Sequence, residues 1–212
     1  MEQQHPQSND ETTVNTTSRE EPEILDAIAR GIAGDQSGFA DLYAHYASGV
    51  YRLCYSLLLN HQDAEDVVQE VFVYAFKNLH RYDPDRAAFK TWLYTITVSR
   101  CRNVYRRQRP LLVTLAQLFQ TNISAPRSER PEAMMAERAA QDALVSALAA
   151  LSSNLREAVM LRYGHGLTYR EIAEVMNCPQ KTAESRVRLA HERLRGVLEP
   201  VGEGLLQELM GF

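Results

Sequence analysis

The chain has 212 residues, of which 45% are hydrophobic and 24% charged, a composition typical of a folded protein rather than a disordered one. Its formal net charge of −4 disfavours nucleic-acid binding on average, so the charge has to be counted by segment. No apolar run approaches the ~20 residues that span a bilayer, the polar N-terminus is not a secretory signal, and the three cysteines are isolated. We therefore expect no membrane insertion and a cytoplasmic location.

Residues 1–22 are mostly Gln, Asn, Thr, Ser and Glu, which predicts a disordered tail. Much of the acidity lies there, because residues 1–26 carry seven acidic residues against one arginine, a net charge of −6. Residues 23–109 should then form a helical domain, since residues 50–163 contain no glycine and few prolines. No segment alternates with a two-residue period, so the predicted fold is all-α, with two small helical domains.

The clearest helix of the first domain has an apolar stripe at three- and four-residue steps. The stripe consists of Ala64, Val67, Val68, Val71, Phe72, Ala75, Phe76 and Leu79. The polar side carries Asp63, Glu65, Asp66, Gln69 and Glu70. Acids near a helix N-terminus stabilise its dipole, but this group also suits docking of a basic partner. A nuclease metal site on Asp63, Asp66 and Glu70 is an alternative; no histidine lies at ligand spacing, so we expect no metal.

A second helix is predicted from about Ala88 to Arg109, where Pro110 should end it. Residues 77–109 carry nine basic and two acidic residues, a net charge of +7. Arginines interleaved with Tyr94 and Tyr105 suit a surface that holds unstacked bases. The alternative is a group of cations that complement the helix C-terminus.

Residues 110–136 contain three prolines and no clear periodicity, which predicts a flexible linker. The leucines and the phenylalanine of residues 111–119 would either dock on a partner or form a short helix. Residues 137–200 should form the second helical domain, and residues 201–212 a C-terminal extension with an amphipathic pattern.

The second domain has the spacing of a helix-turn-helix. Asn154 to Glu157 and Thr168 to Glu171 both predict capping boxes at helix starts. A short helix from Thr168 to Met176, a turn over residues 177–179 and a helix from Gln180 follow in order. The second helix of this motif enters the DNA major groove, and residues 179–195 carry a net charge of +3. The residues that would face base edges are Gln180, Lys181, Thr182, Glu184, Ser185, Arg186 and Arg188. An antiparallel helix pair with a charged, solvated face is the alternative.

No pattern in the chain predicts catalysis. The six histidines are scattered, and none pairs with a cysteine at zinc spacing. A glycine-rich phosphate loop and a nucleophile elbow are both lacking from the sequence. We therefore expect neither enzyme activity nor a cofactor.

Several strings together resemble one family. In the first domain they are Phe39-Ala-Asp-Leu-Tyr, Asp63-Ala-Glu-Asp-Val-Val-Gln-Glu-Val-Phe72 and Phe89-Lys-Thr-Trp-Leu-Tyr-Thr-Ile96. In the second they are Leu155-Arg-Glu157, Leu161-Arg-Tyr163, Leu167-Thr-Tyr-Arg-Glu-Ile-Ala-Glu174 and Thr182-Ala-Glu-Ser-Arg186. The chain resembles the extracytoplasmic-function (ECF) sigma factors of bacterial RNA polymerase.

The resemblance implies partners and residue roles. Core RNA polymerase would bind Asp63, Glu65, Asp66, Gln69 and Glu70. The −10 promoter element would be held by His80, Arg81, Tyr82, Tyr94, Arg100, Arg106 and Arg107. The helix-turn-helix residues would read the −35 element. An anti-sigma factor is an open question, and a free-standing helix-turn-helix regulator is the alternative function.

Overall fold

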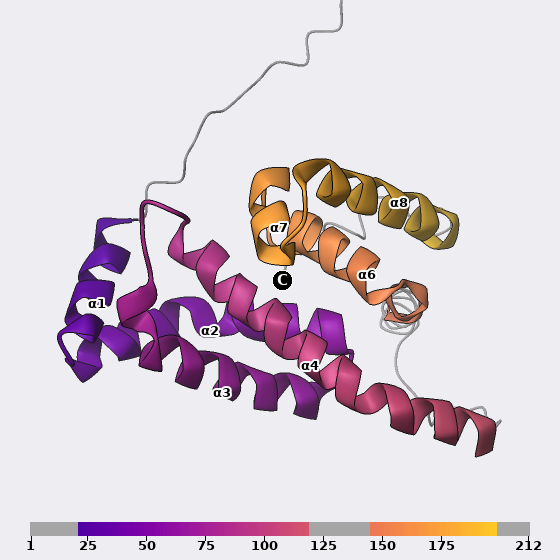
Figure 1. The fold of residues 1–212 in the computed structure, drawn as a ribbon, viewed down its shortest axis with the longest axis horizontal. Helices are drawn as coiled ribbons and strands as arrows, with labels where there is room; N and C mark the ends of the chain where they lie inside the picture. The colour runs from indigo at the N-terminus through magenta and orange to yellow at the C-terminus, as the bar shows by residue number, and fades with distance from the viewer. Residues whose placement is uncertain (1–20, 119–144, 199–212) are drawn as a thin grey trace, which may run out of the picture.

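The structure, a computed structural model, describes residues 21–118 and 145–198. Within these ranges it contains helices and no strand, which confirms the predicted all-α fold (Figure 1). The predicted tail up to residue 20, most of the predicted linker and the C-terminal extension lie outside the described residues.

The N-terminal domain consists of α1 (Pro22–Ile32), α2 (Gln36–Leu58), α3 (His61–Lys77), the 3₁₀ turn η1 (Leu79–Arg81) and α4 (Phe89–Leu118). Helix α1 begins at the last residue of the predicted tail, because a proline suits the first turn of a helix, where its missing N–H costs nothing. Ile24, Ala27 and Ile28 of α1 are buried in the domain.

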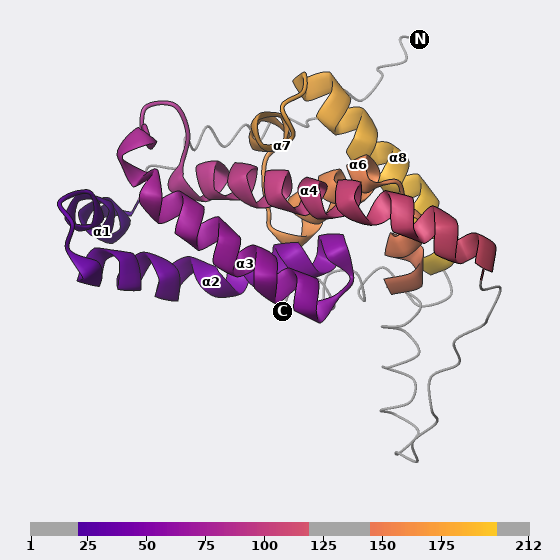
Figure 2. The ribbon, with the colours of Figure 1, turned by 60° about the horizontal axis from the view of Figure 1, so that its bottom comes forward.

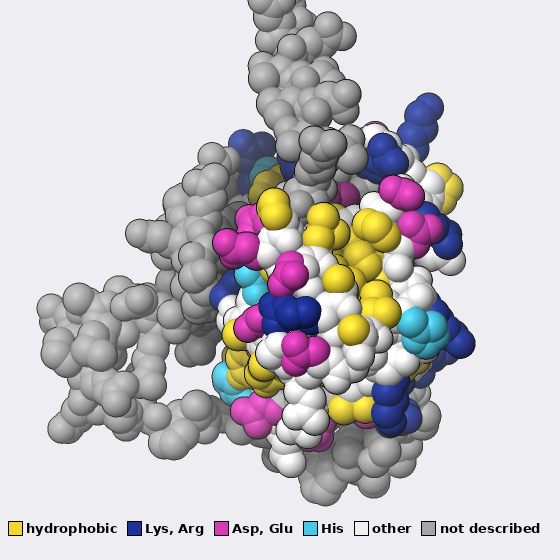
Figure 3. Space-filling model, turned by 90° about the vertical axis from the view of Figure 1, so that its left-hand side faces the viewer, with side chains coloured by type: hydrophobic (Ala, Val, Ile, Leu, Met, Phe, Trp, Pro, Cys, Tyr) yellow, Lys and Arg dark blue, Asp and Glu magenta, His cyan; other side chains and the backbone are white. Residues whose placement is uncertain are grey.

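Helices α1 and α2 meet closely at Gly38. A Cβ atom there would lie 2.5 Å from the Ala27 carbonyl oxygen and 2.6 Å from the Gly31 nitrogen, so only glycine fits. Arg30 joins the same helices, since its guanidinium binds Asp26 at 2.8 Å and Asp41 at 2.7 Å. The end of the molecule that α1 forms presents interspersed apolar, acidic and basic side chains (Figure 3).

The predicted apolar stripe of α3 is confirmed. All of its members are buried except Phe76, which is half-buried and packs on Phe39 with ring centroids 4.8 Å apart. The helix begins at His61 because the Asn60 side chain accepts a hydrogen bond from the Asp63 N–H at 3.0 Å.

The prediction that Pro110 ends the basic helix is wrong, because α4 continues to Leu118. A proline inside a helix removes one backbone hydrogen bond and costs about 3 kcal/mol, which weakens the helix without forcing it to stop. The leucines, alanine and glutamine that follow have high helix propensity and favour its continuation. The first nine residues of the predicted linker are therefore helical.

The C-terminal domain consists of a helical segment at 145–150, α6 (Ser153–Val159), the π-helical turn η2 (Met160–Gly164), α7 (Tyr169–Met176) and α8 (Gln180–Leu198). The capping box of Thr168 and Glu171 is present as predicted. Asn177 ends α7 with φ 51°, in the left-handed conformation that the helix-turn-helix turn requires.

The predicted capping box of Asn154 and Glu157 is wrong. Helix α6 begins two residues earlier than that box implies, at Ser153, with Ser152 in place of Asn154 at the N-cap. The Glu157 carboxylate binds Arg102 of α4, with Oε2 to Nη2 at 2.6 Å, and a charged partner competes strongly with a backbone amide.

The two domains are in contact. Helix α7 packs against α4, and η2 packs against α2. Figures 1 and 2 both show α6 and α7 alongside α4. Helix α8 packs on α6 and α7, on the side of the domain away from α4.

Candidate functional site

The acidic face of α3 points away from the domain core. Glu65, Asp66, Gln69 and Glu70 are exposed and Asp63 is half-buried, while the opposite side of the helix is buried. The structure thus brings all five predicted polymerase-binding residues onto one helical surface. Their exposure leaves them open to a basic partner.

Glu70 also contacts the basic helix. Its Oε2 lies 3.9 Å from Nη1 of Arg100, and the Arg100 guanidinium lies over the ring of Tyr74, 4.7 Å from the centroid. The acidic set and the basic set are therefore neighbours across α3 and α4. The sequence did not predict this contact, because it joins residues thirty positions apart.

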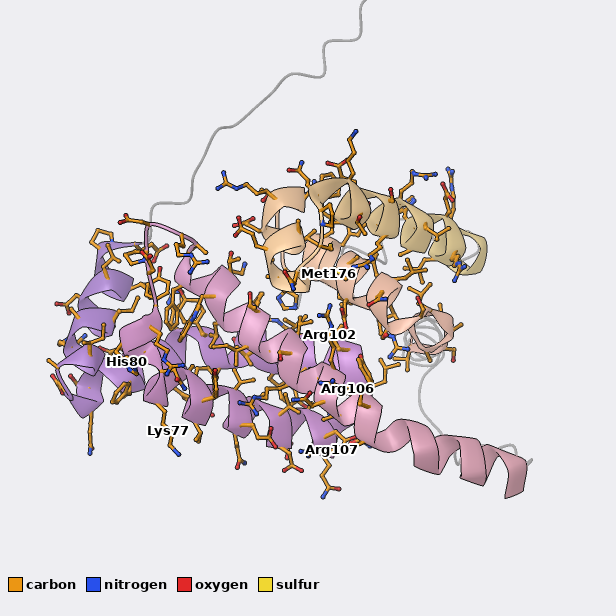
Figure 4. All side chains as sticks on the ribbon, viewed as in Figure 1. Lys77, His80, Arg102, Arg106, Arg107 and Met176 are labelled. Atoms are coloured by element: carbon orange, nitrogen blue, oxygen red, sulfur yellow. The ribbon has the colours of Figure 1, made fainter. Side chains whose placement is uncertain are left out.

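The predicted −10 residues fall into separate groups. His80 and Arg81 are exposed on η1, and Arg106 and Arg107 are exposed on α4. Figure 4 shows His80 near the end of α3 and the two arginines well along α4, so these groups do not form one compact patch.

Tyr82 and Tyr94, in contrast, are buried in this structure. Tyr82 is 8% exposed and packs against Phe89 and Trp92, with ring centroids 5.2 and 5.6 Å apart. Tyr94 is 2% exposed, and its hydroxyl lies 3.0 Å from Nδ1 of His165 in the C-terminal domain. Burial raises the pKa of Tyr94 to about 12.

The predicted −35 residues lie on the outer side of α8. The inner side buries Ala183, Val187, Ala190 and Leu194, which are spaced for one helical face. The seven predicted residues are exposed or half-buried, and none is fully buried. Gln180 donates a hydrogen bond to Glu184 at 2.9 Å, and Arg188 binds Glu192 at 2.9 Å.

Arg170, a neighbour of this surface, was not among the residues predicted from the sequence. An open groove of about 450 Å³ at the helix-turn-helix corner is lined by residues of α7, the turn and the start of α8, including Arg170 and Gln180. The Arg170 side chain is 76% exposed and binds Glu174 at 3.4 Å. Its position could have indicated it, because Arg170 lies in the first turn of α7, the first helix of the helix-turn-helix. In this motif the first helix crosses the DNA backbone.

Comparison with known proteins identifies the two domains. Residues 42–110 match sigma-70 region 2, and residues 141–194 match sigma-70 region 4. The ECF RNA polymerase sigma-E factor of Escherichia coli (strain K12) is 33% identical over 180 residues, which cover 82% of this chain and 93% of that protein. The chain belongs to the ECF sigma factors. It is therefore a sigma factor of bacterial RNA polymerase.

Two solved structures are similar to this sigma factor. CnrH, in complex with the cytosolic domain of CnrY, has a TM-score of 0.62 and 25% identity, covering 85% of this chain and 99% of that one. The sigma factor RpoE of Bartonella quintana, in complex with the anti-sigma factor NepR, has a TM-score of 0.61 and 24% identity. It covers 77% of this chain and 98% of that one.

The sigma factor also has polar contacts between its domains that the sequence did not predict. Arg102, in the basic helix, binds Glu157 through two nitrogens. Arg156, in the region 4 domain, donates to the Leu57 carbonyl at 2.7 Å. Such contacts follow from how two domains pack, for which local sequence patterns give no signal.

The nuclease alternative finds no support in the described ranges. Among residues 21–118 and 145–198, no group of three His, Cys, Asp or Glu side chains is close enough to hold a metal ion. A search of the same ranges found no helix with the length and apolar character needed to cross a membrane.

Proposed function

We propose that the acidic face of α3 is the surface by which this sigma factor docks on core RNA polymerase. The observation that carries the proposal is the exposure of Glu65, Asp66, Gln69 and Glu70 on one side of a helix whose other side is buried. An exposed row of carboxylates steers and orients a basic partner. The role extends to Asp63, at the start of the same row.

We further propose that the two basic regions bind promoter DNA. His80, Arg81, Arg100, Arg106 and Arg107 would hold the −10 element. Tyr94, which contacts His165 of the C-terminal domain, would join them once the two domains separate. Tyr82 would join them once its contacts with Phe89 and Trp92 of its own domain open. Gln180, Lys181, Thr182, Glu184, Ser185, Arg186 and Arg188 would read the −35 element as duplex. The residues between the domains would link the two sites. Binding of one domain to DNA would then raise the effective concentration of the other domain at its own element.

We infer that the protein acts in the cytoplasm, where RNA polymerase transcribes, and that it has no enzyme activity of its own. The related RpoE was solved with an anti-sigma factor, and this supports a similar regulatory partner for the present chain.

Reconstitution with purified core RNA polymerase tests the proposal. The holoenzyme should select specific promoter fragments from a DNA library and give run-off transcripts from them. Asp66→Lys should weaken binding to core by at least about tenfold, because it reverses a charge on the docking face. Glu23→Lys, an equal charge change at an exposed position of α1, should leave core binding unchanged.

The free-standing regulator predicts a different result. Under that alternative the isolated chain binds duplex DNA tightly, Asp66→Lys has no effect, and core polymerase adds nothing. Absence of core binding by the unmodified chain would overturn the proposal.

A further inference from the structure

Tyr74 and Arg100 form a stacked pair where α3 and α4 meet. The Arg100 guanidinium lies over the Tyr74 ring, 4.7 Å from its centroid, and the two helices pack against each other. Tyr74 is 39% exposed and the Arg100 side chain is 29% exposed, so the pair can be reached from solvent. Tyr74 belongs to neither of the two residue sets proposed above for this domain.

The surroundings of Arg100 favour stacking over phosphate binding. Oε2 of Glu70 lies 3.9 Å from Nη1 of Arg100, a distance for an ionic contact rather than a hydrogen bond. The carboxylate offsets part of the positive charge of Arg100 and so weakens its attraction for a phosphate. Stacking on a base is affected less, because it depends on the flat face of the guanidinium as well as on its charge.

A second Arg–Tyr stack in the chain has a structural role, and the two pairs differ. Arg162 lies over the Tyr169 ring, 4.8 Å from its centroid, and its Nη1 donates to the Leu167 carbonyl at 2.9 Å. That arginine therefore holds the turn before α7. The Arg100 guanidinium makes no hydrogen bond within the part of the chain that the structure describes, so its N–H donors are available to a ligand.

The stacked pair has a cation on each side. Lys77 is exposed on α3, three residues after Tyr74, and Arg107 is exposed on α4, seven residues after Arg100 and on the same helical face. Figure 4 shows Lys77 towards one end of this helix pair and Arg107 towards the other. A single strand whose phosphates contact both cations would pass over the stacked pair.

We propose that Tyr74 and Arg100 form a platform on which one unpaired base of the promoter stacks when the −10 element is opened. The inference rests on the proposed function, because it adds a base contact to the DNA-binding surface of α4. The base lies on the face of the Arg100 guanidinium that is turned away from Tyr74. The tyrosine ring behind the guanidinium holds it in place.

The platform accepts any base, because every base has a flat face on which it can stack. Purines should bind more tightly than pyrimidines, since their faces are larger. Duplex DNA does not use the platform, because its bases already stack on one another. The site therefore acts on the opened strand and not on the closed promoter.

Fluorescence anisotropy with two single-stranded probes tests the platform. One probe is a fluorescein-labelled strand of about 12 deoxyadenosines, within the usual length of a single-strand site. The other has the same phosphates but an abasic site in place of every base. Both would be titrated with the holoenzyme and, in parallel, with the full free chain. The unmodified protein should bind the deoxyadenosine strand at least about fivefold more tightly than the abasic strand.

Tyr74→Leu and Arg100→Lys remove the platform in different ways. Leucine has no flat ring, and lysine keeps the charge of arginine without its plane. Each variant should weaken binding of the deoxyadenosine strand by at least about fivefold. Binding of the abasic strand and the salt dependence should stay unchanged, because the phosphate contacts remain. The double variant should bind no more weakly than either single variant, because the two residues act as one unit.

Tyr43→Leu is the matched control. Tyr43 is 48% exposed on α2, and its ring packs on Phe72 with centroids 4.7 Å apart. Its replacement should leave the affinity for both probes unchanged. Tyr74→Phe keeps the ring and should bind like the unmodified protein. Circular dichroism of each variant would show that it is folded.

Three results would count against the platform. Equal losses for both probes would make Arg100 a phosphate contact, and unchanged affinity for both would leave the pair with a structural role alone. Loss of core binding by Tyr74→Leu would assign the pair to the polymerase interface. If the unmodified chain fails to bind core while the free chain gives the expected probe results, the docking proposal is wrong and the platform stands.

Discussion

Arg156 shows how much one side chain contributes to this structure. Its planar guanidinium binds four carbonyl oxygens, three in its own domain and one in the other. Leu57, the acceptor in the other domain, also accepts from the Tyr105 hydroxyl. One guanidinium therefore satisfies carbonyl groups at two helix ends and forms a contact between the domains.

Arg156→Lys should lower the free energy of unfolding by about 1–2 kcal/mol, because lysine keeps the charge but cannot reach four carbonyls at once. Urea denaturation followed by circular dichroism would measure it. Arg193→Lys, at an exposed position of α8, should change stability by less than about 0.5 kcal/mol. Equal effects of the two substitutions would contradict the role given to Arg156.

At the scale of elements, the close approach of α1 and α2 depends on Gly38. The Arg30 contacts with Asp26 and Asp41 cross the same helix pair, but they are exposed and contribute little. The position of α1 therefore depends mainly on its buried aliphatic side chains and on the absence of a side chain at position 38.

Gly38→Ala should destabilise the N-terminal domain by about 1–3 kcal/mol, since the new methyl group would displace backbone atoms of α1. Thermal unfolding would detect the change. Gly164→Ala is the matched control, because its Cβ would meet only the flexible end of Met160, at 3.0 Å. If the two variants have the same Tm, α1 does not pack on α2 as described.

Sequence patterns predicted the elements well wherever one physical cause dominated. The α3 stripe follows from burial of one helical face, and the Thr168 capping box from two local hydrogen bonds. The errors at Pro110 and Glu157 have a common origin. In each case another contribution outweighed a local rule. At Pro110 it was the helix propensity of the residues that follow, and at Glu157 it was the ion pair with Arg102 of the other domain.

At the scale of the whole molecule, charge is divided among segments. Residues 77–109 carry +7 and residues 179–195 carry +3, within a chain whose net charge is −4. The positive segments lie on different domains: the −35 residues lie on the outer side of α8, whereas the −10 residues do not form one compact patch. The placement of the candidate residues on α3 and α8 was predictable. The burial of Tyr94 was not, because it depends on how the helices and domains pack.

The free chain should bind a selected promoter fragment at least about a hundredfold more weakly than the holoenzyme does. Its two domains pack against each other, and the gain from two linked sites requires both domains to reach the DNA together. Fluorescence anisotropy over a range of salt concentrations would measure both affinities. The affinity of the free chain should fall steeply with salt, as phosphate contacts require. Equal affinities would favour the free-standing regulator.

The contact of Glu70 with Arg100 has a consequence for how this surface can change. At 3.9 Å and partly exposed, the pair contributes at most about 1 kcal/mol, so either residue can exchange its partner at small cost. The two residues nevertheless belong to different proposed interfaces, one for protein and one for DNA. Substitutions at positions 70 and 100 should therefore be epistatic, with effects that do not add. A substitution selected for one interface changes the charge beside the other interface. A change at either position should then favour a compensating substitution at the other.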